Sequence, residues 1–262
     1  MRRSRIQNYL MLALLGLVPL RCYSAEALLA VAANFSVPAR AIATQFEQVT
    51  GHKILVSQGS SGKLYAQIRN GAPFDVFLSA DQKHPQLLLE QGLAVVDSRF
   101  TYAHGALALW SAKNDMMLDE HVLARQEFKK IALANPDLAP YGLAALQALE
   151  SMKLDKALQK KMVYGENISQ TYQFVASGNA ELGFVALSQV FTNEDAHGGS
   201  YWRIPSLLHE AIAQDAVLLL QGSNNEAAQA FMNYLSSAEA VEIITRYGYS
   251  GDALVAEERH DG

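Results

Sequence analysis

Short apolar runs alternate with amphipathic stretches along this chain, and the alternation restricts the fold more than any other feature. Leu28–Ala33, Lys53–Ser57 and Phe74–Ser79 have the length and composition of strands, and Ile42 and Phe46 between the first two recur at helical spacing. Similar runs follow at Gly105–Ser111, Ile131–Ala134, Met162–Tyr164, Leu182–Leu187 and Ala216–Leu220. Strands that alternate with helices predict an α/β fold with mixed sheets flanked by helices.

The length of the chain bears on the number of domains. With 262 residues, half of them hydrophobic, the chain is near the size at which one core divides into two. No linker rich in Pro, Gly or Ser separates two halves of the sequence. If two domains form, we therefore expect the chain to cross between them more than once.

The N-terminal segment has the pattern of an export signal. Arg2, Arg3 and Arg5 precede the apolar run Leu10–Leu20, and small residues follow up to Ala25. A basic start, a short apolar centre and a small-residue cleavage site are typical of a secretory signal peptide. The run is shorter than the roughly 20 apolar residues that a membrane-spanning helix needs. We predict that residues 1–25 are a signal peptide and that the protein is periplasmic.

Removal of this segment changes the charge and the cysteine content. The segment carries four arginines and no acidic residue, so its loss changes the formal net charge from −5 to −9. It also carries Cys22, the only cysteine, which excludes disulfides and thiolate metal sites from the exported chain. An acidic chain without a basic cluster argues against a nucleic-acid partner.

Four predicted strand ends lead directly into predicted helix starts with small or hydroxylic residues. They are Ala33-Asn34, Ser60-Ser61, Tyr141-Gly142 and Asn167-Ile168. A helix N-terminus presents unpaired N–H groups and the positive end of the helix dipole, so it binds anions without Lys or Arg. Junctions converging in one cleft would surround an anion with neutral donors. Each junction taken alone is better explained by ordinary capping and turn chemistry.

Seven stretches, in order along the exported chain, resemble one protein family. They are VAANF (31–35), TGHKILVSQGSSG (50–62), YAQIRNGAPFDVFLSAD (65–81), SRFTYAHGALALWSA (98–112), ANPDLAPYGLAA (134–145), ASGNAELGFVALSQ (176–189) and RYGY (246–249). Together they are similar to the periplasmic molybdate-binding proteins of bacterial molybdate importers of the ATP-binding-cassette (ABC) type. The resemblance implies a two-lobed type II periplasmic-binding-protein fold with a ligand cleft between the lobes. We place lobe 1 at residues 26–107 with 212–262, and lobe 2 at 108–211.

The resemblance also implies a set of anion contacts. Asn34, Ser61 and Tyr141 would donate hydrogen bonds from side chain or backbone, and Ile168 from its backbone N–H. Ala33 stands where some relatives carry a hydroxyl residue, so only its N–H is available. Ala186 falls where other relatives contact the ligand through a tyrosine.

The family further implies a ligand and a partner. The ligand would be molybdate or tungstate, with molybdenum present only inside the oxyanion and without direct protein ligands. We expect no cofactor, no enzymatic activity and a monomer that closes on its anion and docks on the membrane permease of an ABC importer.

Other functions remain open on the sequence alone. The same fold could serve sulfate, phosphate or another small anion, and Asp75 or Asp81 could then accept the proton of a phosphate, although both suit structural or capping roles. A serine hydrolase is a more remote alternative, because GSSG lacks the G-x-S-x-G turn. The seven histidines show no metal-binding spacing.

Overall fold

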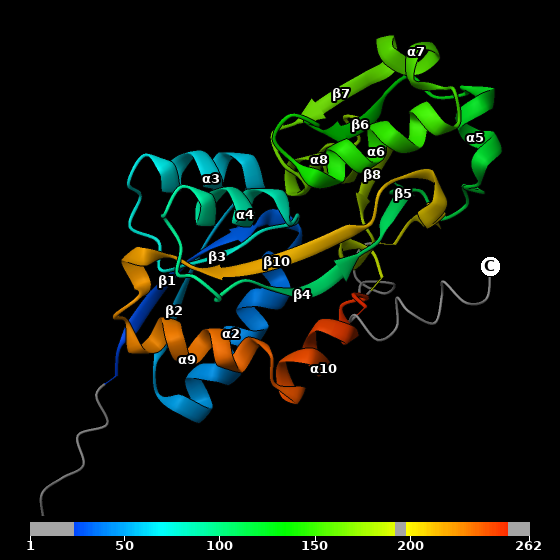
Figure 1. Ribbon diagram of the computed structural model, residues 1–262. Coiled ribbons are helices and arrows are strands. Elements are labelled where there is room, and N and C mark those ends of the chain that lie inside the picture. Colours follow the sequence, from blue (N-terminus) through cyan, green and yellow to red (C-terminus); the bar gives the residue numbers. More distant parts are fainter. Residues whose placement is uncertain (1–23, 192–197, 251–262) are drawn as a thin grey trace, which may run out of the picture.

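The computed structural model describes residues 24–191 and 198–250, so most of the predicted signal peptide and residues 251–262 of predicted lobe 1 lie outside it. Two five-stranded sheets form two lobes, lower left and upper right in Figure 1. This confirms the predicted two-lobed α/β fold with mixed sheets. None of the helices in the described ranges combines the length and apolarity needed to cross a bilayer.

The first sheet has the strand order β2-β1-β3-β10-β4, in which β10 runs antiparallel to both neighbours. Its strands are β1 (Glu26–Ala32), β2 (Lys53–Gly59), β3 (Val76–Leu78), β4 (Phe100–Gly105) and β10 (Ile212–Leu218). The helical segments of this lobe are η1 (Ala33–Phe35), α2 (Ser36–Thr50), α3 (Ser61–Arg69), α4 (Lys83–Glu90), η5 (Leu220–Gly222), α9 (Glu226–Leu235) and α10 (Ala238–Arg246).

Alternation along β1 divides the core of this lobe between the two faces of the sheet. Leu29 and Val31 pack in one cluster with Phe46 of α2 and with α9 and α10. Ala30 packs in the other, with Leu64 of α3 and with α4. Successive side chains of a strand point to opposite faces, so helices cover both sides of the sheet (Figure 1).

The second sheet has the order β7-β6-β8-β5-β9, with β6 parallel to β7 and β8, and β5 antiparallel to β8 and β9. Its strands are β5 (Leu107–Ser111), β6 (Ile131–Ala134), β7 (Met162–Gly165), β8 (Leu182–Ala186) and β9 (Ser200–Arg203). Its helical segments are α5 (Glu120–Arg125), α6 (Pro140–Ser151), α7 (Asp155–Leu158), η2 (Gln159–Lys161), α8 (Ile168–Ala176), η3 (Leu187–Gln189) and η4 (Ser206–Leu208).

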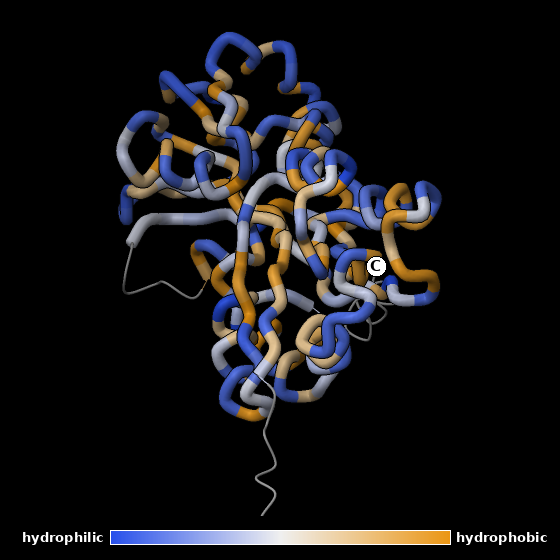
Figure 2. Tube along the Cα trace, turned by 90° about the vertical axis from the view of Figure 1, so that its left-hand side faces the viewer, coloured by the Kyte–Doolittle hydropathy of each residue, from blue (hydrophilic) through white to orange (hydrophobic). Residues whose placement is uncertain are grey.

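Within the described residues, the chain passes between the lobes twice, from β4 to β5 and from η4 into β10. Figure 2 shows hydrophilic residues along many of the outermost turns, with apolar residues alternating along the elements between them. A core cluster that is mainly in lobe 2 also includes Ala33, Ala80 and Ile212 from the first lobe. The two lobes are therefore in direct contact at the ends of their strands.

Candidate functional site

A small cavity lies where the strand ends of the two lobes meet. Its volume of about 10 Å³ admits the centre of roughly one water-sized sphere. Backbone and side chains from both lobes form the wall: Ala32, Ala33, Asn34, Gly59, Ser60, Ser61, Ala80, Ala139, Pro140, Tyr141, Asn167 and Ile168. Every one of these side chains is uncharged at neutral pH, so any electrostatic attraction for an anion comes from hydrogen-bond donors and helix dipoles.

Three helices begin at this cavity. The first residues of α3 and α8 are Ser61 and Ile168, and Tyr141 is the second residue of α6. They follow the carboxyl ends of β2, β6 and β7, where clefts form in α/β sheets. The structure thus brings together Ala33, Asn34, Ser61, Tyr141 and Ile168 in one wall. That these five residues bind an anion stays a prediction.

Ser61 is placed to donate a hydrogen bond into the cavity. Its side chain is buried, and its Oγ accepts the Ala80 N–H at 2.9 Å. A hydroxyl that already accepts one bond keeps its own hydrogen for another acceptor. The Ser61 O–H is therefore available to an oxyanion.

Ser60 is a wall residue that sequence reasoning placed at a candidate anion-binding junction but did not include among the predicted anion contacts. It occupies the N-cap position of α3, yet its side chain makes no capping hydrogen bond. Its Oγ is buried and has no hydrogen-bond partner among the described residues. An unpaired buried hydroxyl costs about 1–3 kcal/mol. The run of two serines was the only sequence signal, and it could not show which hydroxyl lacks a partner.

Asn34 is held by residues of its own lobe. Its amide group donates to Gln214 Oε1 at 2.8 Å and to the Tyr249 hydroxyl at 3.1 Å. The Tyr249 hydroxyl in turn donates to the Asn34 carbonyl at 2.9 Å. Both amide hydrogens of Asn34 are therefore used, and its backbone N–H is the donor left for the cavity.

Tyr141 joins the same buried network from the other lobe. Gln214 Nε2 donates to its hydroxyl at 3.4 Å, next to Gly105, where a Cβ atom would lie 2.0 Å from that oxygen. Burial raises the pKa of the Tyr141 hydroxyl well above its usual value, and burial raises the pKa of Tyr249 to about 12. Both hydroxyls stay protonated at neutral pH. Since the Tyr141 hydroxyl lies in this network, its backbone N–H at the start of α6 is the better donor for a ligand.

Ile168 presents its backbone at the start of α8. The Asn167 side chain caps the helix by accepting the N–H groups of Ser169 and Gln170, both at 3.0 Å. The Ile168 N–H lies outside these capping bonds and beside the cavity. It matches the backbone donor predicted at this position.

Ala186 lies outside the wall of the cavity. It is fully buried at the end of β8, and its N–H donates to Gln189 Oε1 at 3.0 Å. Gln189 Nε2 then donates to the Ile168 carbonyl at 3.4 Å. Its side chain is a methyl group and its N–H is used within lobe 2, so this arrangement offers no donor at Ala186, and a ligand contact there stays a prediction.

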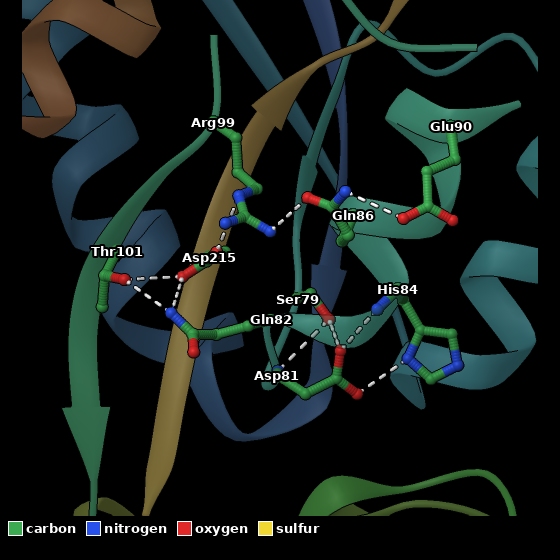
Figure 3. Close-up of polar contacts among 9 residues, drawn as sticks. All are labelled: Ser79, Asp81, Gln82, His84, Gln86, Glu90, Arg99, Thr101 and Asp215. Carbon is green, nitrogen blue, oxygen red and sulfur yellow. Dashed lines mark hydrogen bonds and ion pairs between the residues drawn. The ribbon is translucent and has the colours of Figure 1, made fainter. Parts of the chain in front are cut away.

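The two aspartates considered as proton acceptors, Asp75 and Asp81, are used within lobe 1, and Figure 3 shows the contacts of Asp81. Asp81 Oδ1 accepts the Ser79 hydroxyl at 3.1 Å and the His84 N–H at 2.9 Å, while Oδ2 pairs with the His84 ring at 2.7 Å. Asp75 Oδ2 accepts the Leu28 N–H at 2.7 Å. Neither belongs to the wall, so the described cavity offers no carboxylate to a protonated anion.

Asp215 is a buried charge with its own partners. Thr101 donates to it at 2.7 Å and Gln82 at 3.2 Å, and the Arg99 Nε lies 3.4 Å from its second oxygen (Figure 3). These contacts fix β10 against β4 and the loop that precedes α4. The described residues hold no group of three or more His, Cys, Asp or Glu side chains that could bind a metal ion.

A larger groove of about 750 Å³ opens on one side of the small cavity. It shares Ala33 and Asn34 with the cavity and includes Arg40 and Arg246. Arg40 is partly occupied, since it donates to the Ser36 carbonyl at 3.2 Å. Anions in an open groove stay hydrated and their attraction to charges is screened, whereas the small cavity can surround an anion with donors. We therefore take the small cavity as the candidate site.

Known proteins share this architecture. The profile of the family "Bacterial extracellular solute-binding protein" matches residues 27–250. The molybdate-binding protein ModA of Azotobacter vinelandii is 51% identical over 235 residues, 89% of this chain and 93% of the relative. ModA of Rhodobacter capsulatus is 45% identical over 238 residues, 91% of this chain and 93% of that relative.

A solved structure supports the same grouping. The periplasmic molybdate-binding protein of Azotobacter vinelandii superposes with a TM-score of 0.81 and 43% sequence identity, covering 86% of this chain and 99% of the other. The family match and these high identities agree with the two-lobed fold. This chain belongs to the bacterial extracellular solute-binding proteins, in the group of the molybdate-binding ModA proteins.

Proposed function

We propose that this protein captures molybdate or tungstate in the cavity between its lobes and delivers the anion to an ABC importer. The observation that carries the proposal is a wall of neutral donors at three helix N-termini, without a carboxylate among the described residues that form it. The names of the ModA relatives give the class of anion that fits these donors.

The donor set favours a fully deprotonated tetrahedral anion. Every available group that we identify at the wall can donate a hydrogen, either a serine hydroxyl or a backbone N–H, and none of them is a carboxylate. A phosphate that carries a proton needs an acceptor for it, and both oxygens of Asp81 already accept hydrogen bonds within lobe 1. Molybdate and tungstate are unprotonated dianions at neutral pH. Discrimination against sulfate, which is also unprotonated, would rest on the size of the cavity.

Binding and release would depend on movement of the lobes. The wall of the cavity takes residues from both lobes, so movement of the lobes changes the space and the donors that an anion meets. Each hydrogen bond to an ionised group contributes about 1.5–3 kcal/mol, so several of them would offset the cost of ordering the lobes. An anion that contacts both lobes favours their closure, because its affinity is higher for the closed state.

We also propose the cellular setting from the family. The protein would act in the periplasm after removal of residues 1–25, as a monomer that docks on a membrane permease. It would bind its ligand without transforming it, and molybdenum would enter only as the oxyanion. These points rest on what solute-binding proteins of this family do.

Calorimetric titration with four anions tests the proposal. Protein stripped of bound anions is titrated separately with molybdate, tungstate, sulfate and phosphate. We expect tight one-to-one binding of the first two and no measurable heat of binding from the last two. Tight binding of sulfate or phosphate would move the function to another importer, and no binding of any anion would refute it.

A further inference from the structure

Ser60 has a hydroxyl that the fold itself does not use. Ser60 is 3% exposed and lines the cavity, and its Oγ has no hydrogen-bond partner within residues 24–191 and 198–250. A serine at an N-cap normally accepts the N–H of the second or third helical residue. Here the N–H of Gly62, the second residue of α3, donates instead to the Leu138 carbonyl of the other lobe at 2.9 Å.

The position of Ser60 in the sheet explains why its hydroxyl reaches the same space as Ser61. Strands β1 and β2 are parallel and in register up to the pair Ala32 and Gly59. The next residues, Ala33 and Ser60, therefore follow the ends of adjacent strands, and both line the cavity. Ala33 has no hydroxyl, so Ser60 provides the side-chain donor at this part of the wall.

We propose that the Ser60 hydroxyl donates a hydrogen bond to the bound oxyanion and is an affinity-determining contact of the site. The inference rests on the proposed capture of molybdate or tungstate and adds a contact to it. Ser61 and Ser60 would donate to the anion as a pair, the first while accepting the Ala80 N–H and the second with no other bond. Such a contact satisfies a buried group that otherwise stays unpaired.

The Ser60→Ala variant separates this role from a structural one. The hydroxyl makes no bond inside the protein, so its removal leaves the melting temperature of the anion-free protein unchanged or higher. The same variant loses a bond to a charged ligand, and we expect the Kd for molybdate to rise about tenfold or more, which corresponds to about 1.4 kcal/mol. Tungstate should lose affinity by a similar factor.

Ser237→Ala provides the matched control. Ser237 is the N-cap of α10, lies outside the cavity wall, and its Oγ accepts the Ala240 N–H at 3.3 Å. Its replacement should lower the melting temperature and leave the Kd for molybdate unchanged. Ser60→Ala should therefore change the Kd without lowering the melting temperature, and Ser237→Ala should lower the melting temperature without changing the Kd.

The outcomes are distinguishable. The inference is supported if the Ser60→Ala variant binds molybdate at least tenfold more weakly without loss of stability. It is overturned if wild type binds molybdate and the variant binds it within about twofold, or if the variant loses stability by as much as Ser237→Ala does. If wild type itself binds none of the four anions, the proposed function fails first and this inference fails with it.

Discussion

At the scale of single residues, Ser61 has two hydrogen-bonding roles that can be measured separately. Its Oγ accepts the Ala80 N–H at 2.9 Å, and its own hydrogen is available to the cavity. Loss of the hydroxyl therefore leaves a buried N–H unpaired as well as removing a donor. This differs from Ser60, whose hydroxyl has no protein partner among the described residues.

The Ser61→Ala variant is expected to lose both stability and affinity. The unpaired Ala80 N–H should lower the free energy of unfolding by about 1 kcal/mol or more. The lost bond to the anion should raise the Kd for molybdate about tenfold. Thermal unfolding and calorimetry measure the two effects. An unchanged Kd would remove Ser61 from the site, whatever the change in stability.

Sequence reasoning located most of the wall but not the partners of its side chains. Strand ends and helix starts were visible in the sequence as apolar runs followed by small or hydroxylic residues. The residues predicted at these junctions line the cavity: Asn34, Ser61, Tyr141 and Ile168. The hydrogen bonds from the Asn34 side-chain amide to Gln214 and Tyr249 join residues that are 180 and 215 positions apart in the sequence. Contacts over such separations depend on the tertiary fold, and no local pattern contains them.

At the scale of elements, strands that are continuous apolar runs could be predicted from the sequence, and strands that also contain polar residues could not. The predicted run Ile131–Ala134 coincides with β6, and Lys53–Ser57 lies within β2. In contrast, the prediction at Ala216–Leu220 missed the first half of β10, where the buried polar residues Gln214 and Asp215 interrupt the apolar pattern. Their hydrogen bonds to distant residues make burial possible there.

Two further strands had no recognisable signal. β4 contains Thr101 and His104, and β9 is a strand of four residues with exposed or partly exposed side chains. Short strands on the edges of sheets are stabilised mainly by pairing with a neighbour, as β4 pairs with β10 and β9 with β5. Their existence depends on tertiary contacts more than on local composition.

Helix α3 offers a test of how closely the lobes approach. A Cβ atom on Gly62 would lie 3.1 Å from the Leu138 carbonyl oxygen and 3.2 Å from its Cα, across the lobe interface. Gly62→Ala should therefore weaken molybdate binding several-fold by keeping the lobes slightly apart. Stability of the anion-free protein should stay equal or rise by up to about 1 kcal/mol, since alanine favours helix over glycine.

Gln67→Ala on the same helix is the control for the Gly62 variant. Gln67 is exposed and lies outside the cavity wall, so its replacement should leave the Kd for molybdate unchanged. Calorimetry on both variants gives the comparison. Equal affinities for the Gly62 variant and wild type would show that binding does not need this close approach.

At the scale of the whole molecule, a buried network joins the lobes beside the cavity. Tyr249 of lobe 1 pairs with Ser188 of lobe 2 at 2.9 Å, and Gln214 of lobe 1 donates to Tyr141 of lobe 2 at 3.4 Å. The same two lobe 1 residues hold the Asn34 side chain. Closure of the lobes and the position of a predicted anion contact are therefore linked through shared hydrogen bonds.

Tyr249→Phe should weaken this link while keeping the ring that packs edge-on against Phe35. We expect several-fold weaker molybdate binding and, by small-angle scattering, a more open anion-free protein. Tyr234→Phe is the matched control, because the Tyr234 hydroxyl is buried without a partner among the described residues. Affinity equal to that of wild type in the Tyr249 variant would contradict the link.

The lobe boundaries and the export signal remain predictions from the sequence. The lobe boundaries at residues 107 and 211 were inferred from the family resemblance, and export depends on residues 1–25, most of which lie outside the described chain. The two-lobed fold itself is confirmed by the sheets and by the solved relative. Sequence patterns identify which segments form sheets more reliably than where one lobe passes into the other.

The central claim is that the neutral cavity, and not a cationic surface, holds the oxyanion. Anomalous scattering of tungsten in crystals grown with tungstate tests it most directly. We predict one strong peak in the cavity, with oxygens about 2.7–3.1 Å from the Ser60 and Ser61 hydroxyls and from the N–H groups of Asn34, Tyr141 and Ile168. A peak in the groove beside Arg40 and Arg246, with none in the cavity, would contradict the claim.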